Sequence, residues 1–420
     1  MNPDKDEPDL NAWTSSVRFS DCLHFCPPLG RPKKVSRIAR RLCLLVNPWW
    51  FTLFFTLFIG HESPDLVFAQ TIEWKSMGLQ NVPIIDLVVD ERKPAVQGTD
   101  ASSTTICAIT PTNVYISHGD SSWYVLNNLS LDQDIACFSY PTNSGYGLLC
   151  STEYGIMQSY PLGSEWEFIG SGFGAERSVV SMSVARSSPS FMYAITSENS
   201  SNGADDEIIK TNDRGKTWFA LSTPPQQTSP TLLHGVYVDP HRSNTVYATV
   251  DEAGVPWVIK STDGGARWNE IKHFHGVAQI TDLCFDPEIS NTVYFIGGTV
   301  HRGGIYKSTD GLRTYEQKME SKRLFRLFMH PTNRQILFGL ELPHTIHYST
   351  NAGERWSTVN TVGLNSKYVA LSMAVDSHST IYLGIAKHGV FRSEQKIGNH
   401  ISSLKALGSI ISVSTARRGE

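Results

Sequence analysis

The chain has 420 residues, a formal net charge of −4 and a pI near 6.4. Charged residues make up 18% and aromatic residues 10% of the sequence, a balance typical of a packed, strand-rich protein and not of a disordered one. Because the chain carries no basic excess, its composition argues against a nucleic-acid-binding role.

A basic stretch, an apolar stretch and two small or branched residues follow one another near the N-terminus. Arg31–Arg41 is basic, and Leu42–Gly60 is apolar and uncharged. Val67 and Ala69 occupy the −3 and −1 positions for signal-peptidase cleavage after Ala69. This order is typical of an export signal, and an apolar core of about 19 residues is also long enough to cross a bilayer uncleaved. We therefore predict a polar segment over 1–41, a signal peptide or signal anchor over 42–69, and an extracytoplasmic body that contacts the membrane only through this segment.

The body begins with one isolated strand, after which a unit of strands recurs. Thr71–Gly78 is followed by units that each contain an apolar strand, a turn that often holds Asp-Pro or His-Pro, and two further strands. Four of these units end in a Ser/Thr-x-Asp-x-Gly-x-x-Trp box, which is loosened to Tyr315 in the third copy and to Asn351 in the last, and the boxes begin at Thr211, Ser261, Ser308 and Ser349. A period of about 45 residues is typical of propeller blades.

Eroded copies of the unit bring the count to seven. Two copies precede the first box, and the last copy, Tyr368–Ser393, has three strands and lacks a fourth. We predict an all-β, seven-bladed propeller of four-stranded antiparallel blades over 70–396, in which Thr71–Gly78 supplies the missing strand and closes the ring, followed by a tail over 397–420. Such closure leaves no exposed end to the ring.

The boxes are predicted to be structural turns. Asp accepts backbone N–H groups of its own turn, Gly adopts positive φ, and Trp buries a large surface between sheets. Asn351 replaces Asp in the last box, which suits a turn cap and not acid–base catalysis. The residues assigned to this role are Asp213, Gly215, Trp218, Asp263, Gly265, Trp268, Asp310, Tyr315, Asn351, Gly353 and Trp356.

The box resembles the Asp-box, or bacterial neuraminidase repeat, from Thr71 to about Ser393. Sialidases carry it on six blades with an Arg-Ile-Pro motif that this chain lacks. In size and layout the chain is similar to the photosystem II stability and assembly factor family, in which a signal precedes one seven-bladed propeller. That resemblance implies a non-catalytic protein that binds a partner protein, although fold alone does not establish function.

The loops between second and third strands, and between one blade and the next, hold the candidate binding residues. Ring closure is expected to turn these loops towards one face. The residues are His301, Arg302, His344, Lys387, His388, Arg323, Asp251 and Glu252. They could bind an acidic segment of a partner protein, the histidines could converge on a metal, or the side chains could simply be solvated. Likewise, Asp205–Glu207 could hold calcium or only face solvent.

The main prediction is therefore a partner-binding scaffold without cofactor or metal. No Gly-x-Ser-x-Gly, His-Glu-x-x-His or phosphate-loop motif occurs. The alternative is a glycoside hydrolase acting on an extracellular glycan, which would need two carboxyl groups facing each other. Asp251, Glu252, Glu316 and Glu341 are available for such a pair, but their spacing in the sequence does not place them together.

The cysteines leave one question open. Cys137 and Cys150 could face each other on neighbouring strands of a hairpin and form a disulfide bond, or they could remain buried free thiols.

Overall fold

The structure is a computed structural model of the whole chain. It describes residues 70–90, 104–119, 121–126, 136–142, 145–152, 155–159, 166–170, 177–198, 206–221, 231–252, 255–274, 277, 279–298, 303–321 and 323–397. The predicted signal or anchor lies outside these residues. Within them, no helix has the length and apolar character needed to cross a membrane.

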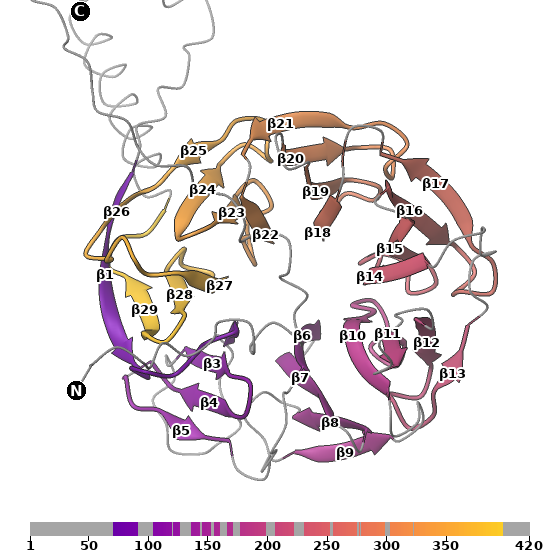
Figure 1. Cartoon of the computed structure of the whole chain (residues 1–420), viewed down its shortest axis with the longest axis horizontal. Coiled ribbons are helices and arrows are strands. Elements are labelled where there is room, and N and C mark those ends of the chain that lie inside the picture. The colour runs from indigo at the N-terminus through magenta and orange to yellow at the C-terminus, as the bar shows by residue number, and fades with distance from the viewer. Residues whose placement is uncertain are drawn as a thin grey trace, which may run out of the picture. The chain divides into compact units, whose positions relative to one another are not determined.

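Seven β-sheets are arranged in a ring, so the body is a seven-bladed β-propeller (Figure 1). Blade 1 contains β2 (Asp86–Asp90), β3 (Thr105–Ile109), β4 (Val114–Ser117) and β5 (Tyr124–Val125). Blade 2 contains β6 (Ala136–Thr142), β7 (Gly145–Thr152), β8 (Gly155–Ser159) and β9 (Glu167–Gly170). Blade 3 contains β10 (Arg177–Val184), β11 (Met192–Glu198), β12 (Glu207–Thr211) and β13 (Phe219–Ala220).

The remaining blades follow the same plan. Blade 4 contains β14 (Thr231–Val238), β15 (Val246–Glu252), β16 (Val255–Ser261) and β17 (Asn269–His273). Blade 5 contains β18 (Gln279–Phe285), β19 (Val293–Gly298), β20 (Gly303–Ser308) and β21 (Glu316–Glu320). Blade 6 contains β22 (Leu324–Met329), β23 (Leu337–Glu341), β24 (Thr345–Ser349) and β25 (Ser357–Thr358). Blade 7 contains β1 (Thr71–Gly78), β26 (Asn360–Val362), β27 (Ala370–Val375), β28 (Ile381–Ile385) and β29 (Gly389–Ser393).

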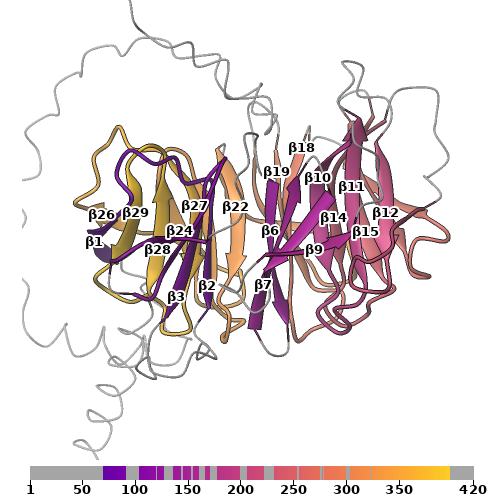
Figure 2. The same cartoon turned by 90° about the horizontal axis from the view of Figure 1, so that it is seen from below.

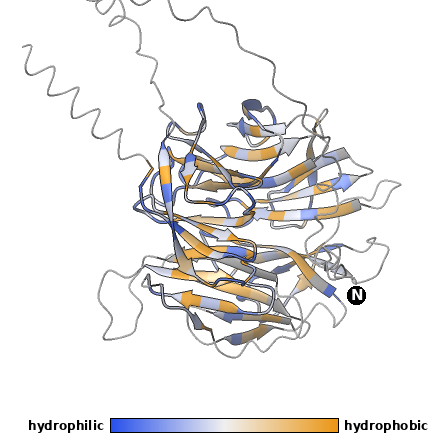
Figure 3. Ribbon diagram, turned by 60° about the vertical axis from the view of Figure 1, so that its left-hand side comes forward, coloured by the Kyte–Doolittle hydropathy of each residue, from blue (hydrophilic) through white to orange (hydrophobic). Residues whose placement is uncertain are grey.

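The core lies between neighbouring blades. The second strand of each blade is packed on both faces, so β3 and β28 are buried along their whole length and read as continuous apolar runs. The inner strands run across the thickness of the ring (Figure 2). Hydrophobic residues are concentrated in the strands of the blades (Figure 3).

Blade 7 joins the two ends of the described chain. β1 pairs antiparallel with β29, with Trp74 opposite Ser393, and the side-chain amide of Gln70 donates to the carbonyl of Lys396 at 2.6 Å. β1 also pairs in parallel with β26, so this sheet has five strands where the sequence predicted four. The reason is that the chain leaving blade 6 runs along the rim over Asn360–Val362 before it turns inward to β27.

Each box forms one repeated set of hydrogen bonds. In the third box, the Ser308 hydroxyl donates to Asp310 Oδ1 at 2.9 Å and accepts from the Leu312 N–H at 2.9 Å. Asp310 Oδ1 in turn accepts from the Thr314 N–H at 2.9 Å. Asn351 Oδ1 accepts from the Arg355 N–H at the same distance, so an amide oxygen replaces the carboxylate without loss of the bond. The boxes that begin at Thr211 and Ser261 make the same bonds.

The third box departs from the glycine pattern. Leu312 occupies the position of Gly265 and Gly353, with φ of 73°, and its side chain is fully buried. A residue other than glycine is strained in this left-handed conformation. We infer that burial of the leucine side chain against Tyr247 and Phe295 offsets that strain.

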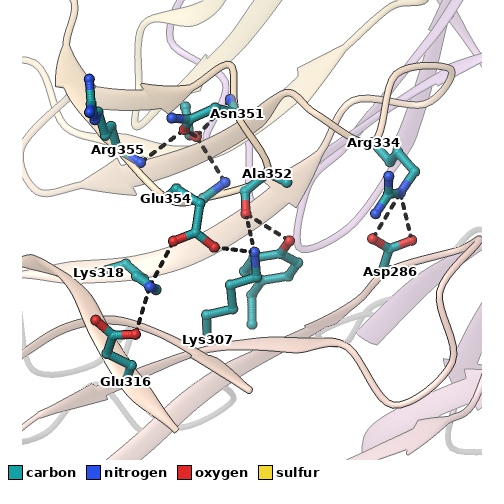
Figure 4. Close-up of polar contacts among 12 residues, drawn as sticks. Asp286, Lys307, Glu316, Lys318, Arg334, Asn351, Ala352, Glu354 and Arg355 are labelled. Carbon is teal, nitrogen blue, oxygen red and sulfur yellow. Dashed lines mark hydrogen bonds and ion pairs between the residues drawn. The ribbon is translucent and has the colours of Figure 1, made fainter. Parts of the chain in front are cut away.

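A lysine and a tyrosine of one blade hold the box of the next blade. Lys307 Nζ donates to the Ala352 carbonyl at 2.8 Å and contacts Glu354 at 2.6 Å, and the Tyr294 hydroxyl donates to the same carbonyl (Figure 4). Two repeats earlier, Lys210 Nζ donates to the Gly264 carbonyl at 3.0 Å. Blade 6 has Tyr348 at the lysine position, and the following blade 7 contains no box. The position thus holds a lysine in the blades before the second, third and fourth boxes, whereas blade 2, before the first box, has Gln158 there.

Blade 2 contains a disulfide bond. Cys150 is disulfide-bonded, and the residue opposite it in the β6–β7 ladder is Cys137. Cys107 and Cys284 are free thiols. The interpretation of Cys150 as a buried free thiol is therefore wrong, because directly opposite residues of an antiparallel pair lie close enough for a disulfide bond.

Replacing Lys307 by Met should lower the free energy of unfolding. The change removes a charged donor that is almost buried and leaves the Ala352 carbonyl with one bond fewer, a loss of about 1–3 kcal/mol. Chemical denaturation of the purified chain measures this loss. Lys216→Met, on an exposed box residue, is the matched control and should change stability by less than about 0.5 kcal/mol. Equal stability of the two variants would contradict the role given to Lys307.

The box carboxylates should contribute to stability in a pH-dependent way. Hydrogen bonds from the side chain and backbone of Thr314 lower the pKa of Asp310 to about 2, from an ordinary value near 3.8. A lowered folded-state pKa means that the contribution is present above pH 3.8 and is lost as pH falls through about 2. Asp310→Asn should flatten the acid side of the stability curve and leave stability near pH 7 almost unchanged, whereas Asp310→Ala should be destabilised at both pH values. An Asn variant as unstable as the Ala variant at pH 7 would show that the turn needs the charge.

Candidate functional site

The described candidate residues come from two neighbouring blades and one separate blade. His344 lies between β23 and β24, Lys387 and His388 lie between β28 and β29, and Arg323 directly precedes β22. These loops of blades 6 and 7, with the segment that enters β27, are called the loop face below. Asp251 lies apart on β15 of blade 4. His301, Arg302 and the side chain of Glu252 lie outside what the structure describes.

Tyr368 connects two of the predicted histidines. The His344 ring nitrogen Nδ1 lies 2.8 Å from the Tyr368 carbonyl oxygen, and the His388 ring stacks on the Tyr368 ring with centroids 4.1 Å apart. The sequence analysis did not select Tyr368. The available signal was an aromatic residue just before an inner strand, which is also a common position for a core side chain.

Backbone hydrogen bonds fix the two loops to the segment between them. The Ala370 N–H donates to the Pro343 carbonyl at 2.7 Å, and the Ala386 N–H donates to the Val369 carbonyl at 2.8 Å. Lys387 adopts a φ of 59° in the tight turn, and its side chain and that of His388 are exposed. The loop face thus presents an aromatic stack and a lysine from a backbone held on both sides.

Glu341 is already engaged by a neighbouring strand. Its Oε2 lies 2.7 Å from His347 Nε2, and His347 Nδ1 lies 3.1 Å from the Thr358 hydroxyl. The hydrogen bond from His347 lowers the pKa of Glu341, which suits an ionised partner and not a catalytic acid. Asp251 lies on blade 4 and Glu341 lies on blade 6. Among the described side chains, these two candidates for a glycosidase carboxyl pair are therefore on different blades.

Side chains of the inner strands cap the free edge of the next blade. The Ser181 hydroxyl accepts from the Val236 N–H at 3.1 Å, and Asp282 Oδ2 accepts from the Leu327 N–H at 2.9 Å. Ser181 and Asp282 occupy the same position, directly after the bulge of their strands. Arg326 occupies this position in β22, but a guanidinium has no acceptor and cannot make the same bond.

Asp86, Asp282 and Arg326, on the innermost strands of three blades, form a charged group that the sequence analysis missed. The side chain of Asp282 is half-buried and surrounded by protein, and this burial raises its pKa to about 6 against the opposing effect of Arg326. Burial also raises the pKa of Asp86. Burial alone would lower the pKa of Arg326, but the carboxylates of Asp86 and Asp282 raise it, so the guanidinium stays charged.

The acidic loop of blade 3 has structural partners. Asp206 Oδ2 accepts from the Leu233 N–H at 2.9 Å, and Glu207 lies 3.5 Å from Arg177, while Asp205 is outside the described residues. Across the described part of the chain, no group of three or more His, Cys, Asp or Glu side chains is arranged to hold a metal ion. Neither His344 nor His388 belongs to such a group.

Comparison with known proteins supports the fold and does not assign a family. No family model matches the chain, and no curated protein matches it. An ancestral GH74 enzyme is similar at a TM-score of 0.56 and 14% identity, covering 79% of this chain and 47% of that one, so this chain spans about half its length. YCF48 from Cyanidioschyzon merolae is similar at a TM-score of 0.50 and 12% identity, covering 76% of this chain and 98% of that one. YCF48 bound to D1 peptide is similar at a TM-score of 0.51 and 13% identity, covering 79% of this chain and 99% of that one.

A second enzyme also shares the architecture. Oligogalacturonate lyase from Vibrio parahaemolyticus is similar at a TM-score of 0.54 and 10% identity, covering 78% of this chain and 97% of that one. The predicted resemblance to the photosystem II assembly factor propellers is confirmed at the level of the fold. At these identities the similarity shows the fold alone, and it includes both enzymes and a peptide-binding protein.

Asp282→Asn should change how stability depends on pH. Because the folded-state pKa of Asp282 is raised to about 6, its contribution is fully present below pH 3.8 and is lost as pH rises through about 6. Asparagine keeps the acceptor for the Leu327 N–H but does not ionise. We expect the variant to lose less stability than the parent chain between pH 5 and pH 8, measured by denaturation at each pH. Identical curves would show that Asp282 titrates near its ordinary pKa.

Proposed function

We propose that the protein is an exported, non-catalytic scaffold whose loop face binds a partner protein. The observation that carries this proposal is the stack of the exposed His388 ring on the partly buried Tyr368 ring, held by backbone hydrogen bonds between two neighbouring blades. A rigid aromatic side chain beside cations is typical of the residues that contribute most to protein interfaces. Little entropy is lost when a surface already fixed in place binds its partner.

The charge of the loop face favours an acidic segment in the partner. Arg323, Lys367 and Lys387 all have exposed side chains. Glu341, at the end of β23 beside these loops, is already bonded to His347. Complementary charge speeds association and helps to select the partner. YCF48, which has a similar fold, is known in a complex with a D1 peptide, and this supports peptide binding as a use of the architecture.

Export is part of the same proposal. Its support is the order of the basic stretch, the apolar stretch and the small residues over 31–69. A disulfide-bonded Cys150 agrees with an oxidising compartment outside the cytoplasm.

The test is affinity capture of the full chain from the membranes of its own cells. A variant with Arg323→Glu, Lys387→Glu and Tyr368→Ala should recover at least about tenfold less of the specific partner than the parent chain. The matched control, Arg313→Glu with Arg355→Glu on exposed residues of the boxes, should recover as much as the parent chain. Equal recovery by the loop-face variant would refute the binding face, and a chain found only in the cytoplasmic fraction would contradict export.

A further inference from the structure

The outermost strands of the propeller fall into two chemical classes. In blades 1 to 3 these strands are β5, β9 and β13, with the sequences Tyr-Val, Glu-Phe-Ile-Gly and Phe-Ala. Their exposed side chains include Tyr124 at 61%, Val125 at 47%, Phe168 at 49% and Phe219 at 42%. Glu167 is the one charged residue of the three strands. Large exposed apolar side chains that lie close together mark interaction sites more often than single ones do.

The other blades protect the same edge. β17 and β21 carry charges within the strand, including Glu270, Lys272, Glu316, Lys318 and Glu320. β25 is polar, with only Ser357 and Thr358. Charges and polar residues on an edge strand prevent unwanted pairing with another chain. Blades 1 to 3 lack this protection, although β5 and β13 are short.

Blade 7 shows what covers such an edge. Its fourth strand, β1, has an extended segment of the same chain on its outer side, and the register places Ile72 opposite Thr361 and Glu73 opposite Val362. The Asn360 N–H donates to the Gln70 carbonyl at 2.9 Å. This ladder is three residues long, so a short edge is enough to hold an added strand in this ring. In the described parts of blades 1 to 3, β5, β9 and β13 each end their sheet with no strand beyond them.

The three uncovered strands form one arc along the rim, next to the covered one. Figure 1 shows β5, β9 and β13 following one another around the outside of the ring. The arc begins where β1 ends, because the Trp123 indole N–H, one residue before Tyr124, donates to the Met77 carbonyl at 2.8 Å. A rim that curves over three blades suits an extended polypeptide, which can follow the curve, better than a flat surface.

We propose that the outer edges of β5, β9 and β13 bind an extended, uncharged apolar segment of a partner protein, added as an extra strand in the manner of β26. Main-chain hydrogen bonds from the open edges would provide part of the affinity. Tyr124, Phe168 and Phe219 would contribute by burying their rings against the apolar side chains of the segment. This surface is separate from the loop face, so either binding site can fail its test without the other.

Site-specific photo-crosslinking in the cells that make the protein tests the proposal. The probe is p-benzoylphenylalanine, placed in the full chain at Tyr124, Phe168 or Phe219, and at Glu316 or Ser357 as controls on the polar edges. All three rim positions should crosslink to another protein, with at least about tenfold more adduct than the controls. Mass spectrometry should map the adducts to one uncharged apolar segment.

Other outcomes overturn the proposal. Adducts only with lipid, with a second copy of this chain or with its own residues 398–420 would assign the rim a different occupant. Adduct yields equal to those of the controls would show that nothing binds there. As a second measurement, Tyr124→Lys, Phe168→Lys and Phe219→Lys together should reduce binding of the crosslinked partner at least tenfold. The thermal midpoint should be almost unchanged because these side chains are exposed, and a folded variant that binds as well as the parent chain would also overturn the proposal.

Discussion

The propeller depends on a turn that is held from two sides. Within each box, a buried serine or threonine hydroxyl joins the carboxylate or amide to the backbone N–H groups of the same turn. From the preceding blade, a lysine can also reach the backbone of the turn, as Lys210 reaches Gly264 and Lys307 reaches Ala352. The first set of bonds fixes one hairpin and the second fixes the angle between two blades. Because each blade contacts mainly its neighbours, a local motif repeated several times can define a whole ring.

The sequence predicted those parts of the fold that repeat. Periodicity identified the blades, and the change from Asp to Asn351 indicated that the boxes are turns. The fifth strand of blade 7 was not predicted, because Asn360–Val362 is too short to show a strand pattern and its partner, β1, lies almost 300 residues earlier. The tyrosine of the loop face was missed for a related reason. The contacts of Tyr368 with His344 and His388 become apparent only in the folded structure.

The charged group of Asp86, Asp282 and Arg326 shows why the sequence alone does not reveal which charged residues will interact. Ser181, Asp282 and Arg326 share one position in three inner strands, yet two of them cap a neighbouring backbone N–H and the third cannot. In the sequence, the three residues look like ordinary members of apolar strands. Their charges affect one another only after ring closure has brought Asp86, at the start of blade 1, within electrostatic range of blades 5 and 6. Burial within the protein is the main cause of the raised pKa of Asp282, and the charge of Asp86 adds to it while Arg326 opposes it.

The asymmetry of the ring is the best guide to its use. A propeller whose blades served only to support one another could repeat the same outer strand seven times. Here the outer strands change from apolar in blades 1 to 3 to charged or polar in blades 4 to 6, and the seventh is covered by the chain itself. The cost of an exposed tyrosine or phenylalanine is a tendency to associate, which charged edges avoid elsewhere in the same molecule. The boxes occur on blades 3 to 6 and the polar outer strands on blades 4 to 6, so blade 3 combines a box with an apolar outer strand, and the eroded blades 1 and 2 have apolar outer strands without a box. The apolar outer strands therefore do not simply follow the loss of the box, and their grouping on three consecutive blades is what we expect if those blades bind something outside the ring.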